Sequence, residues 1–288
     1  MDIESWYGRS KRLTLGAHTL CVVDLGASDV PTLLIHGFPT ASIDWQPLAP
    51  ALLEAGLRLI APDLLGYGYS DKPRLKRYSI FDQADLLQEL LRQIGVTSMH
   101  ILAHDYGDTV AQELLARSER GEAGAIAVRS VCFLNGGLFP ETHRPRFIQR
   151  LLASPLGPLL ARRYTRAKFG AAMRAIFAPG TPPSEADLDA FWALIAHNDG
   201  LGIFPKLIGY MAQRRQHRER WVGAMLAARV PIKLINGSLD PVSGAHMVAR
   251  YRELQPNVDI TALADIGHYP QVEAPERVVS AYIAFRNR

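Results

Sequence analysis

The 288-residue sequence has few cysteines, little net charge and no long hydrophobic run. Cys21 and Cys132 both lie in apolar, strand-like runs, which predicts buried thiols and a protein of a reducing compartment such as the cytoplasm. Residues 1–11 contain no apolar signal-peptide core, and no run is long enough for a membrane span, so we expect neither export nor a transmembrane segment. A net charge of +4 without long basic tracts gives no indication of a nucleic-acid partner.

Motifs for cofactors and metals are also missing. The glycines of residues 65–73 lack the spacing of a phosphate-binding loop, so this segment is expected to be a turn-rich connection. The nine histidines show no zinc-site spacing. We therefore expect no cofactor and no metal.

Strand-like and helical patterns alternate in both terminal parts of the chain. Residues 13–25 predict an antiparallel hairpin. Apolar strand-like runs follow at 31–37, 57–63, 99–103, 128–135, 231–236 and 258–263, and helical patterns occur at 79–94, 242–254 and 275–285. This alternation predicts an α/β protein with a mostly parallel, doubly wound sheet.

The segment 140–227 has a different pattern, with helical periodicity and no strand-like run. We interpret it as a helical cap inserted after the sixth strand of a core formed by residues 1–139 and 228–288. The cap carries 13 Lys or Arg and 6 Asp or Glu, a net charge of +7. Its densest basic cluster (Arg214, Arg215, Arg218 and Arg220) is expected to be a solvated helix face, with an acidic partner as the weaker alternative.

The most informative stretch is Ala103-His104-Asp105-Tyr106-Gly107, between a predicted strand and a predicted helix. Two small residues flanking an acid at this position indicate a nucleophile elbow, a sharp turn that exposes one side chain above the sheet. Asp105 stands where a serine is usual. A carboxylate is ionised at neutral pH and can displace a leaving group from an sp³ carbon. The alternative is that Asp105 only caps the following helix.

Other chemically capable residues follow the ends of other strands. Asp240 follows the strand at 231–236, His268 follows the last strand, and the turn of residues 36–39 follows the strand at 31–37. Ligands of such sheets bind beyond the carboxyl ends of the strands, and the order nucleophile, acid, histidine is that of a hydrolase triad. Alternatively, Asp240 before Pro241 only starts a turn, and His268 is an ordinary loop residue.

These motifs resemble the α/β-hydrolase fold proteins that use an aspartate nucleophile, the epoxide hydrolase and haloalkane dehalogenase group. The turn His36-Gly37-Phe38-Pro39 is similar to the epoxide hydrolase oxyanion turn. The sequence resembles the mesoderm-specific transcript proteins more closely still, in His104–Asp108, Asn135-Gly136-Gly137 with residues 139–145, Asn198-Asp199-Gly200, Arg220–Ala224 and Leu239–Val242.

The resemblance implies epoxide hydrolysis through an ester on Asp105, with Asp240 orienting His268. It implies that the N–H groups of Phe38 and Tyr106 form the oxyanion hole, and that a cap tyrosine, Tyr210 or else Tyr164, protonates the opening oxygen. We expect a small substrate with an apolar body, contacted by His36, Phe147, Phe177 and Trp192.

Two other functions stay open. A haloalkane dehalogenase would need halide donors, which the dehalogenases place where this chain has Phe38 and Tyr106. A catalytically silent scaffold that binds a ligand or partner is the third possibility, although it would not need a triad. The sequence leaves the oligomeric state open.

Overall fold

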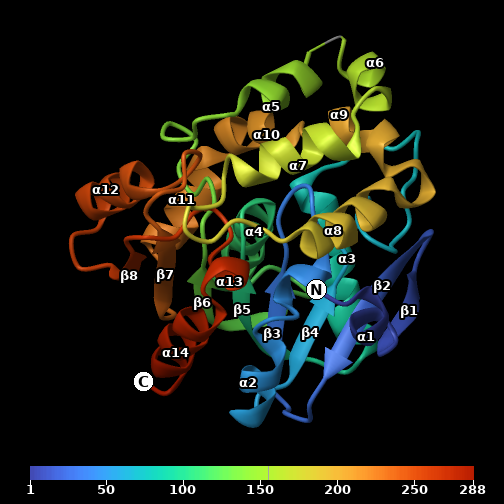
Figure 1. Ribbon diagram of the computed structural model, residues 1–288. Helices are drawn as coiled ribbons and strands as arrows, with labels where there is room; N and C mark the ends of the chain where they lie inside the picture. Colours follow the sequence, from blue (N-terminus) through green and yellow to red (C-terminus); the bar gives the residue numbers. More distant parts are fainter. Residues whose placement is uncertain (155) are drawn as a thin grey trace.

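An eight-stranded β-sheet forms the centre of the molecule, for which a computed structural model describes residues 1–154 and 156–288 (Figure 1). The strand order is β1-β2-β4-β3-β5-β6-β7-β8. The strands are β1 (Ser10–Leu15), β2 (His18–Leu25), β3 (Thr32–Ile35), β4 (Leu59–Pro62), β5 (Ser98–Ala103), β6 (Ala127–Phe133), β7 (Ile232–Gly237) and β8 (Asp259–Leu263). β1 pairs with β2 and β2 with β4 in antiparallel orientation, and the remaining pairs are parallel. The predicted hairpin and mostly parallel sheet are confirmed.

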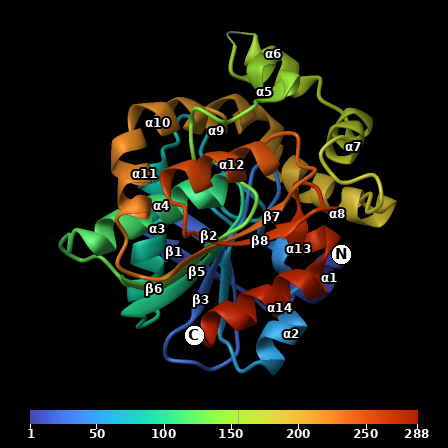
Figure 2. The same ribbon diagram turned by 90° about the vertical axis from the view of Figure 1, so that its left-hand side faces the viewer.

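Helices cover both faces of this sheet. Figure 2 shows α3 (Ile80–Gln93) and α4 (Tyr106–Glu119) on one side, and α2 (Ala49–Glu54) and α14 (Pro275–Arg286) on the other. All four residues of β3 are buried, and so are all four of β4. Strands covered on both faces need apolar residues at consecutive positions, which explains the continuous apolar runs in the sequence.

The N-cap residue of α3 shows how the sequence determines where a helix begins. The Ser79 side chain accepts a hydrogen bond from the backbone N–H of Asp82 at 3.0 Å, as an N-cap residue does. Leu87, Leu90 and Leu91 are fully buried on the face toward the sheet. The helix predicted over 79–94 is confirmed to within one residue at each end.

A run of helices separates β6 from β7 and lies over one end of the sheet (Figure 1). These helices are α5 (Phe147–Leu152), α6 (Gly157–Arg162), α7 (Arg166–Arg174), α8 (Glu185–Ala196), the 3₁₀-helix η2 (His197–Ile203), α9 (Phe204–Leu207), α10 (Tyr210–Gln216) and α11 (Arg218–Leu226). The part of 140–227 that the structure describes contains no strand. We call this segment the cap; its limits at 140 and 227 stay a prediction.

The arginine cluster of the cap is not a solvated helix face as a whole, because only Arg215 of the four is exposed. Arg214 is 2% exposed, at the interface with the core. Arg220 forms ion pairs with Glu113 at 2.6 Å and Glu122 at 2.8 Å, and Arg218 pairs with Glu141. The sequence interpretation was wrong because the partners of these arginines lie in segments distant along the chain.

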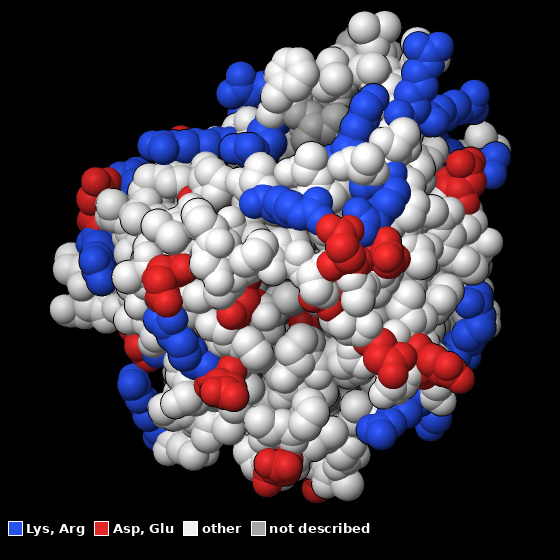
Figure 3. Space-filling model, in the orientation of Figure 1, with Lys and Arg blue, Asp and Glu red and all other residues white. Residues whose placement is uncertain are grey.

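Basic side chains gather over the cap. In Figure 3 the Lys and Arg side chains are concentrated in the upper part of the face, over the cap helices, and most acidic side chains lie below them.

Both cysteines are buried and free, as predicted. None of the helices in the described residues combines the length and hydropathy that crossing a membrane requires. The cytoplasmic location stays a prediction.

Candidate active site

Asp105 occupies a strained turn between β5 and α4. Its backbone has φ 50° and ψ −108°, a conformation that costs about 1–3 kcal/mol for a residue with a side chain. Two glycines make room for this turn. A Cβ on Gly107 would lie 2.2 Å from the carbonyl oxygen of Ile35, and a Cβ on Gly37 would lie 2.8 Å from the Cβ of Asp105. The sequence therefore folds into the predicted elbow.

The carboxylate of Asp105 does not cap helix α4. It makes no capping hydrogen bond to that helix, although Asp105 stands at the N-cap position. Its Oδ1 instead accepts a hydrogen bond from the backbone N–H of Phe38 at 3.0 Å. The capping alternative is wrong, and the side chain is held by the turn that follows β3.

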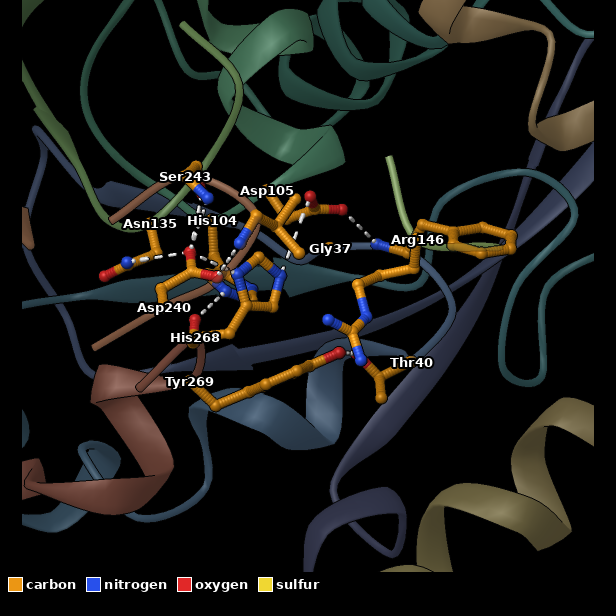
Figure 4. A network of polar contacts seen from close by, with 12 residues as sticks. Gly37, Thr40, His104, Asp105, Asn135, Arg146, Asp240, Ser243, His268 and Tyr269 are labelled. Atoms are coloured by element: carbon orange, nitrogen blue, oxygen red, sulfur yellow. Dashed lines mark hydrogen bonds and ion pairs between the residues drawn. The ribbon is translucent and has the colours of Figure 1, made fainter. Parts of the chain in front are cut away.

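His268 lies between two carboxylates (Figure 4). Its Nδ1–H donates to Oδ2 of Asp240 at 2.8 Å, and its Nε2 lies 3.7 Å from Oδ2 of Asp105. Asp240 also accepts from Asn135 at 3.0 Å and from the N–H and hydroxyl of Ser243 at 3.1 and 2.7 Å. Asp240 thus closes a turn, through the N–H of Val242, and binds His268 at the same time, so it does more than start a turn. Its catalytic role stays a prediction.

The two carboxylates set the protonation of His268. Burial alone would lower the pKa of His268, but the charges of Asp240 and Asp105 and the hydrogen bond that His268 donates to Asp240 raise this pKa to about 9. Burial would raise the pKa of Asp105, yet the charges of His268 and Arg214 hold this pKa below its usual value. At neutral pH the free site therefore contains an imidazolium between two carboxylates.

Two other histidines fix the turns around the site. His104 Nε2–H donates to the carbonyl oxygen of His268 at 2.8 Å. Burial, followed by the charge of His268, lowers the pKa of His104 to about 3, so His104 is neutral. His36 accepts from the N–H of Leu64 at 3.0 Å and is fully buried. The structure gives the predicted substrate contact of His36 no support, because both of its ring nitrogens bind backbone groups.

A cavity of about 290 Å³ lies between Asp105 and the cap. Its lining is mostly apolar and comprises Phe38, Pro39, Asp105, Arg146, Phe147, Gln149, Leu152, Tyr164, Phe169, Ala172, Met173, Ile176, Phe204, Val242 and His268. Phe147, one of the expected substrate contacts, belongs to this lining. A largely apolar cavity with few polar groups in its wall is typical of small-molecule sites.

Two of the predicted substrate contacts pack elsewhere. Phe177 stacks on Tyr269, with ring centroids 5.1 Å apart, and Trp192 packs beside Phe169 at 5.8 Å. Neither belongs to the described lining of the cavity. The structure gives these two predictions no support, because an aromatic residue on a cap helix can pack behind the cavity wall as readily as form its surface.

The two candidate cap tyrosines are placed differently. Tyr164 lines the cavity, and burial raises the pKa of its phenol to about 12. Tyr210 is 1% exposed, and its ring lies 5.0 Å from that of Tyr106. The Tyr210 hydroxyl has no hydrogen-bond partner among the described residues, and burial followed by the charge of Asp105 raises its pKa. Both phenols are protonated at neutral pH.

Arg214 is a contact of the elbow that sequence reasoning missed. Its Nε–H donates to the Thr109 hydroxyl at 2.7 Å, and its Nη2–H donates to the backbone carbonyl of Asp105 at 3.2 Å. Its guanidinium also lies 4.6 Å from the ring centroid of Tyr210. The spacing of four residues between Tyr210 and Arg214 places both on one helix face, and it was the available signal.

A further polar cluster lies behind the elbow. Both carboxylate oxygens of Asp108 are buried without a partner in the described structure, as are both ring nitrogens of His143. Burial, and then the charge of Asp105, raises the pKa of Asp108 well above its usual value, which favours a neutral carboxylic acid. A Cβ on Gly136 would lie 2.1 Å from Oδ2 of Asp108, so glycine is needed there.

In the part of the chain that the structure describes, no group of three or more His, Cys, Asp or Glu is arranged to hold a metal ion.

Comparison with known proteins gives the family. The α/β-hydrolase fold family matches residues 30–275. The bovine mesoderm-specific transcript homolog protein is 41% identical over 99% of this chain and 88% of its own length. Epoxide hydrolase A of Mycobacterium tuberculosis is 29% identical over 92% of this chain and 93% of its own length. A haloalkane dehalogenase of Bradyrhizobium diazoefficiens is 41% identical over 33% of this chain and 30% of its own.

Solved structures agree with the fold. An α/β-hydrolase fold protein from Burkholderia ambifaria superposes with a TM-score of 0.79 at 24% identity, covering 95% of this chain and 97% of the other. The extent of the family match and the similarity to the mesoderm-specific transcript proteins lead to one conclusion: the chain belongs to the α/β-hydrolase fold family.

Proposed function

We propose that the protein hydrolyses epoxides to diols through an ester formed on Asp105. The observation that carries this proposal is the position of the Asp105 carboxylate. It stands at the elbow, accepts from the N–H of Phe38 at 3.0 Å and lies 3.7 Å from Nε2 of His268, at the inner end of an apolar cavity. A relative named epoxide hydrolase supports the same chemistry.

In the first step, Asp105 opens the ring. One carboxylate oxygen attacks an epoxide carbon, the bond between that carbon and the ring oxygen breaks, and the ring oxygen takes a proton from a phenol. The low pKa of Asp105 keeps its carboxylate ionised and ready for attack. The product of this step is a hydroxyalkyl ester of Asp105.

In the second step, His268 activates water. Formation of the ester removes the negative charge of Asp105, which is one of the causes of the raised pKa of His268. This pKa therefore falls in the ester, and neutral His268 can take a proton from a water molecule that attacks Cγ of Asp105. The N–H groups of Phe38 and Tyr106 would stabilise the oxyanion. The bond between Cγ and the alkyl oxygen then breaks, and this oxygen takes the proton held by His268 and leaves as the diol. The second proton of the attacking water is released as the Asp105 carboxylate forms again, and it restores the phenol.

Tyr210 is the proposed proton donor, with Tyr164 as the second candidate. The hydroxyl of Tyr210 is buried, without a hydrogen-bond partner in the described residues, and close enough to Asp105 for that charge to raise its pKa. Tyr164 is favoured by its position in the cavity lining. Each phenol is a weak enough acid to keep its proton until an alkoxide forms.

Haloalkane dehalogenation is the second candidate, and the partial match to a dehalogenase favours it. The Phe38 side chain has no hydrogen-bond donor for a halide, and the Tyr106 hydroxyl is not placed where an indole N–H would be. A silent scaffold is less compatible with the network around His268, in which Asp240 accepts from Asn135, Ser243 and His268.

A substrate panel tests the reaction. Epoxides, haloalkanes and esters of similar size are assayed with the wild type and with Asp105→Ala. We expect turnover of at least one epoxide by the wild type and none by the variant. Turnover of bromoalkanes but of no epoxide would favour the second candidate, and turnover of esters alone would contradict attack on an sp³ carbon.

Heavy-oxygen water tests the ester. If water attacks Cγ of Asp105, repeated single turnovers in this solvent place label in the Asp105 carboxylate, where peptide mass spectrometry detects it. Label in the diol alone would show that water attacks the epoxide directly. Asp240, which accepts hydrogen bonds but does not form an ester, is the internal control and should stay unlabelled.

A further inference from the structure

The outer end of the cavity carries a cation that has no protein partner. Arg146 lines the cavity together with Asp105, and Figure 4 draws both in one close-up. Arg146 is exposed, whereas Asp105 is 3% exposed, so these residues mark the outer and the inner end of the cavity. Across residues 1–154 and 156–288, the Arg146 guanidinium forms no ion pair or hydrogen bond, and only the backbone of Arg146 is used, by Gln149 and Arg150.

Two further arginines stand at the same rim. Arg144 and Arg150 line a surface hollow together with Arg146 and Phe147. Neither side chain has an acidic partner in the described part of the chain. By contrast, Arg166 of the same cap pairs with Glu185 at 2.8 Å and Asp189 at 2.7 Å. The cavity entrance is thus a site of uncompensated positive charge, in the region where Figure 3 shows basic side chains gathered.

The rest of the cavity wall determines what else the ligand must be. Between Arg146 and Asp105 the lining is dominated by apolar side chains, including Phe169, Met173 and Phe204. The only acidic side chain in the described lining is Asp105 itself, which repels an anion from the inner end. A ligand that satisfies the whole cavity therefore has an apolar body with a negative charge at one end.

We propose that Arg146 binds the carboxylate of an amphipathic substrate whose epoxide lies at Asp105. A guanidinium offers two parallel N–H donors, which match the two oxygens of a carboxylate. Arg144 and Arg150 raise the local concentration of such anions. This inference rests on the proposed function for the reactive end of the substrate. It adds the substrate class: an epoxide that bears a carboxylate at the opposite end of its apolar body.

A matched pair of substrates tests the charge. The racemic styrene oxides that bear a para carboxylate and a para carboxamide have the same number of heavy atoms but differ by one charge. In the wild type we expect kcat/KM to be about 10–100-fold higher for the carboxylate, the range for a hydrogen bond to a charged group. Arg146→Gln should bring the ratio of the two kcat/KM values to about one, and Arg146→Lys should retain part of the preference for the carboxylate. Arg166→Gln, in a cap arginine that lies outside the cavity lining, is the matched control and should leave the ratio unchanged.

A binding measurement separates this proposal from the proposed reaction. The dissociation constants of 4-isopropylbenzoate and 4-isopropylbenzamide, which have no reactive group, are measured by titration calorimetry. Tighter binding of the benzoate by the wild type, lost in Arg146→Gln, supports the subsite even if no epoxide is turned over. Equal affinities for the two compounds in the wild type, or a preference that Arg146→Gln leaves unchanged, would overturn it. Turnover of the neutral epoxide with equal affinities would leave the reaction proposal intact and remove only the subsite.

Discussion

The backbone N–H of Phe38 donates to Oδ1 of Asp105 at 3.0 Å, so a group proposed to stabilise an oxyanion already binds the nucleophile in the free protein. This contact orients the carboxylate and leaves Oδ2 on the side of His268, 3.7 Å from Nε2. The same N–H can follow the oxygen of Asp105 through ester formation and hydrolysis. Orientation of the nucleophile and stabilisation of the later oxyanion thus depend on one donor.

Replacing His268 should separate the two chemical steps. His268→Gln retains Asp105 and the phenols, so the ester should form, but no base remains to activate water. We expect intact-protein mass spectrometry to show a stoichiometric adduct, and peptide mapping to place it on Asp105. An inactive variant without adduct would mean that His268 is also needed for ring opening, and an active one would exclude it as the base.

Replacing the phenols should separate epoxides from haloalkanes. An epoxide oxygen leaves as an alkoxide and needs a proton, whereas a halide leaves as a stable anion. Tyr210→Phe should slow epoxide opening by roughly two to four orders of magnitude, the range for loss of a general acid, and leave bromoalkane turnover nearly unchanged. The alkylation rate is measured by rapid quench for one epoxide and one bromoalkane.

Tyr164→Phe is the companion variant for that measurement. A smaller loss than in Tyr210→Phe would show that the two phenols share the oxygen, and a larger loss would make Tyr164 the main donor. Epoxide opening that neither substitution slows would contradict proton donation from the cap.

The pKa of His268 should respond to the charge of Asp105. His268 has a pKa of about 9, partly because the Asp105 carboxylate stabilises the imidazolium. In Asp105→Asn this negative charge is gone, the imidazolium is less stable, and the pKa should fall toward the ordinary value. NMR titration of the ring nitrogens measures it, with His100, whose pKa burial lowers to about 4, as the internal control. A pKa unchanged by the substitution would mean that Asp240 alone sets it.

The pH dependence of ester hydrolysis follows from the same coupling. Because His268 must be neutral to accept a proton, hydrolysis slows as the pH falls below the pKa of His268 in the ester. That midpoint should lie below the value of about 9 in the free protein. The midpoint is measured from the rate of ester decay in single turnovers at a series of pH values. A midpoint at or above the pKa of His268 in the free protein would contradict the proposed effect of losing the Asp105 charge.

Removing the guanidinium of Arg214 should shift the pH below which the rate of ring opening falls. Arg214 is one of the causes of the low pKa of Asp105 and hydrogen-bonds to its carbonyl. In Arg214→Gln the carboxylate is less stabilised, so its pKa should rise and the alkylation rate should begin to fall at a higher pH than in the wild type. Arg215→Gln changes the exposed neighbouring arginine and is the matched control. If the alkylation rate fell by the same factor at every pH, with no shift of the pH dependence, Arg214 would have a purely structural role.

The sequence was sufficient for features that depend on local pattern and on strand ends. The alternating elements predicted the sheet, and the positions of Asp105, Asp240 and His268 after three strands predicted that they meet. Side chains on the cap were harder to place. Trp192 and Phe177 have the composition of a pocket wall, but which face of a cap helix borders the cavity depends on how the helices pack.

Arg214 is a side chain at the site that the sequence did not identify. Four arginines within seven residues look like a solvated surface, and only the tertiary structure shows Thr109 and the Asp105 carbonyl within reach of one of them. Arg146 was also passed over, because the sequence does not show that this one of three neighbouring arginines borders the cavity.

The hydrogen bond from Arg214 to the Asp105 carbonyl has a consequence for protein engineering. The cap helices of this protein lie in the one connection between β6 and β7, which makes the cap a natural segment for exchange with another hydrolase. Here the donor segment would have to supply a guanidinium at the position of Arg214, or the Asp105 carbonyl would keep only its hydrogen bond from the N–H of Asp108 in α4. Chimaeras of this protein should therefore be designed with α10 retained as part of the core.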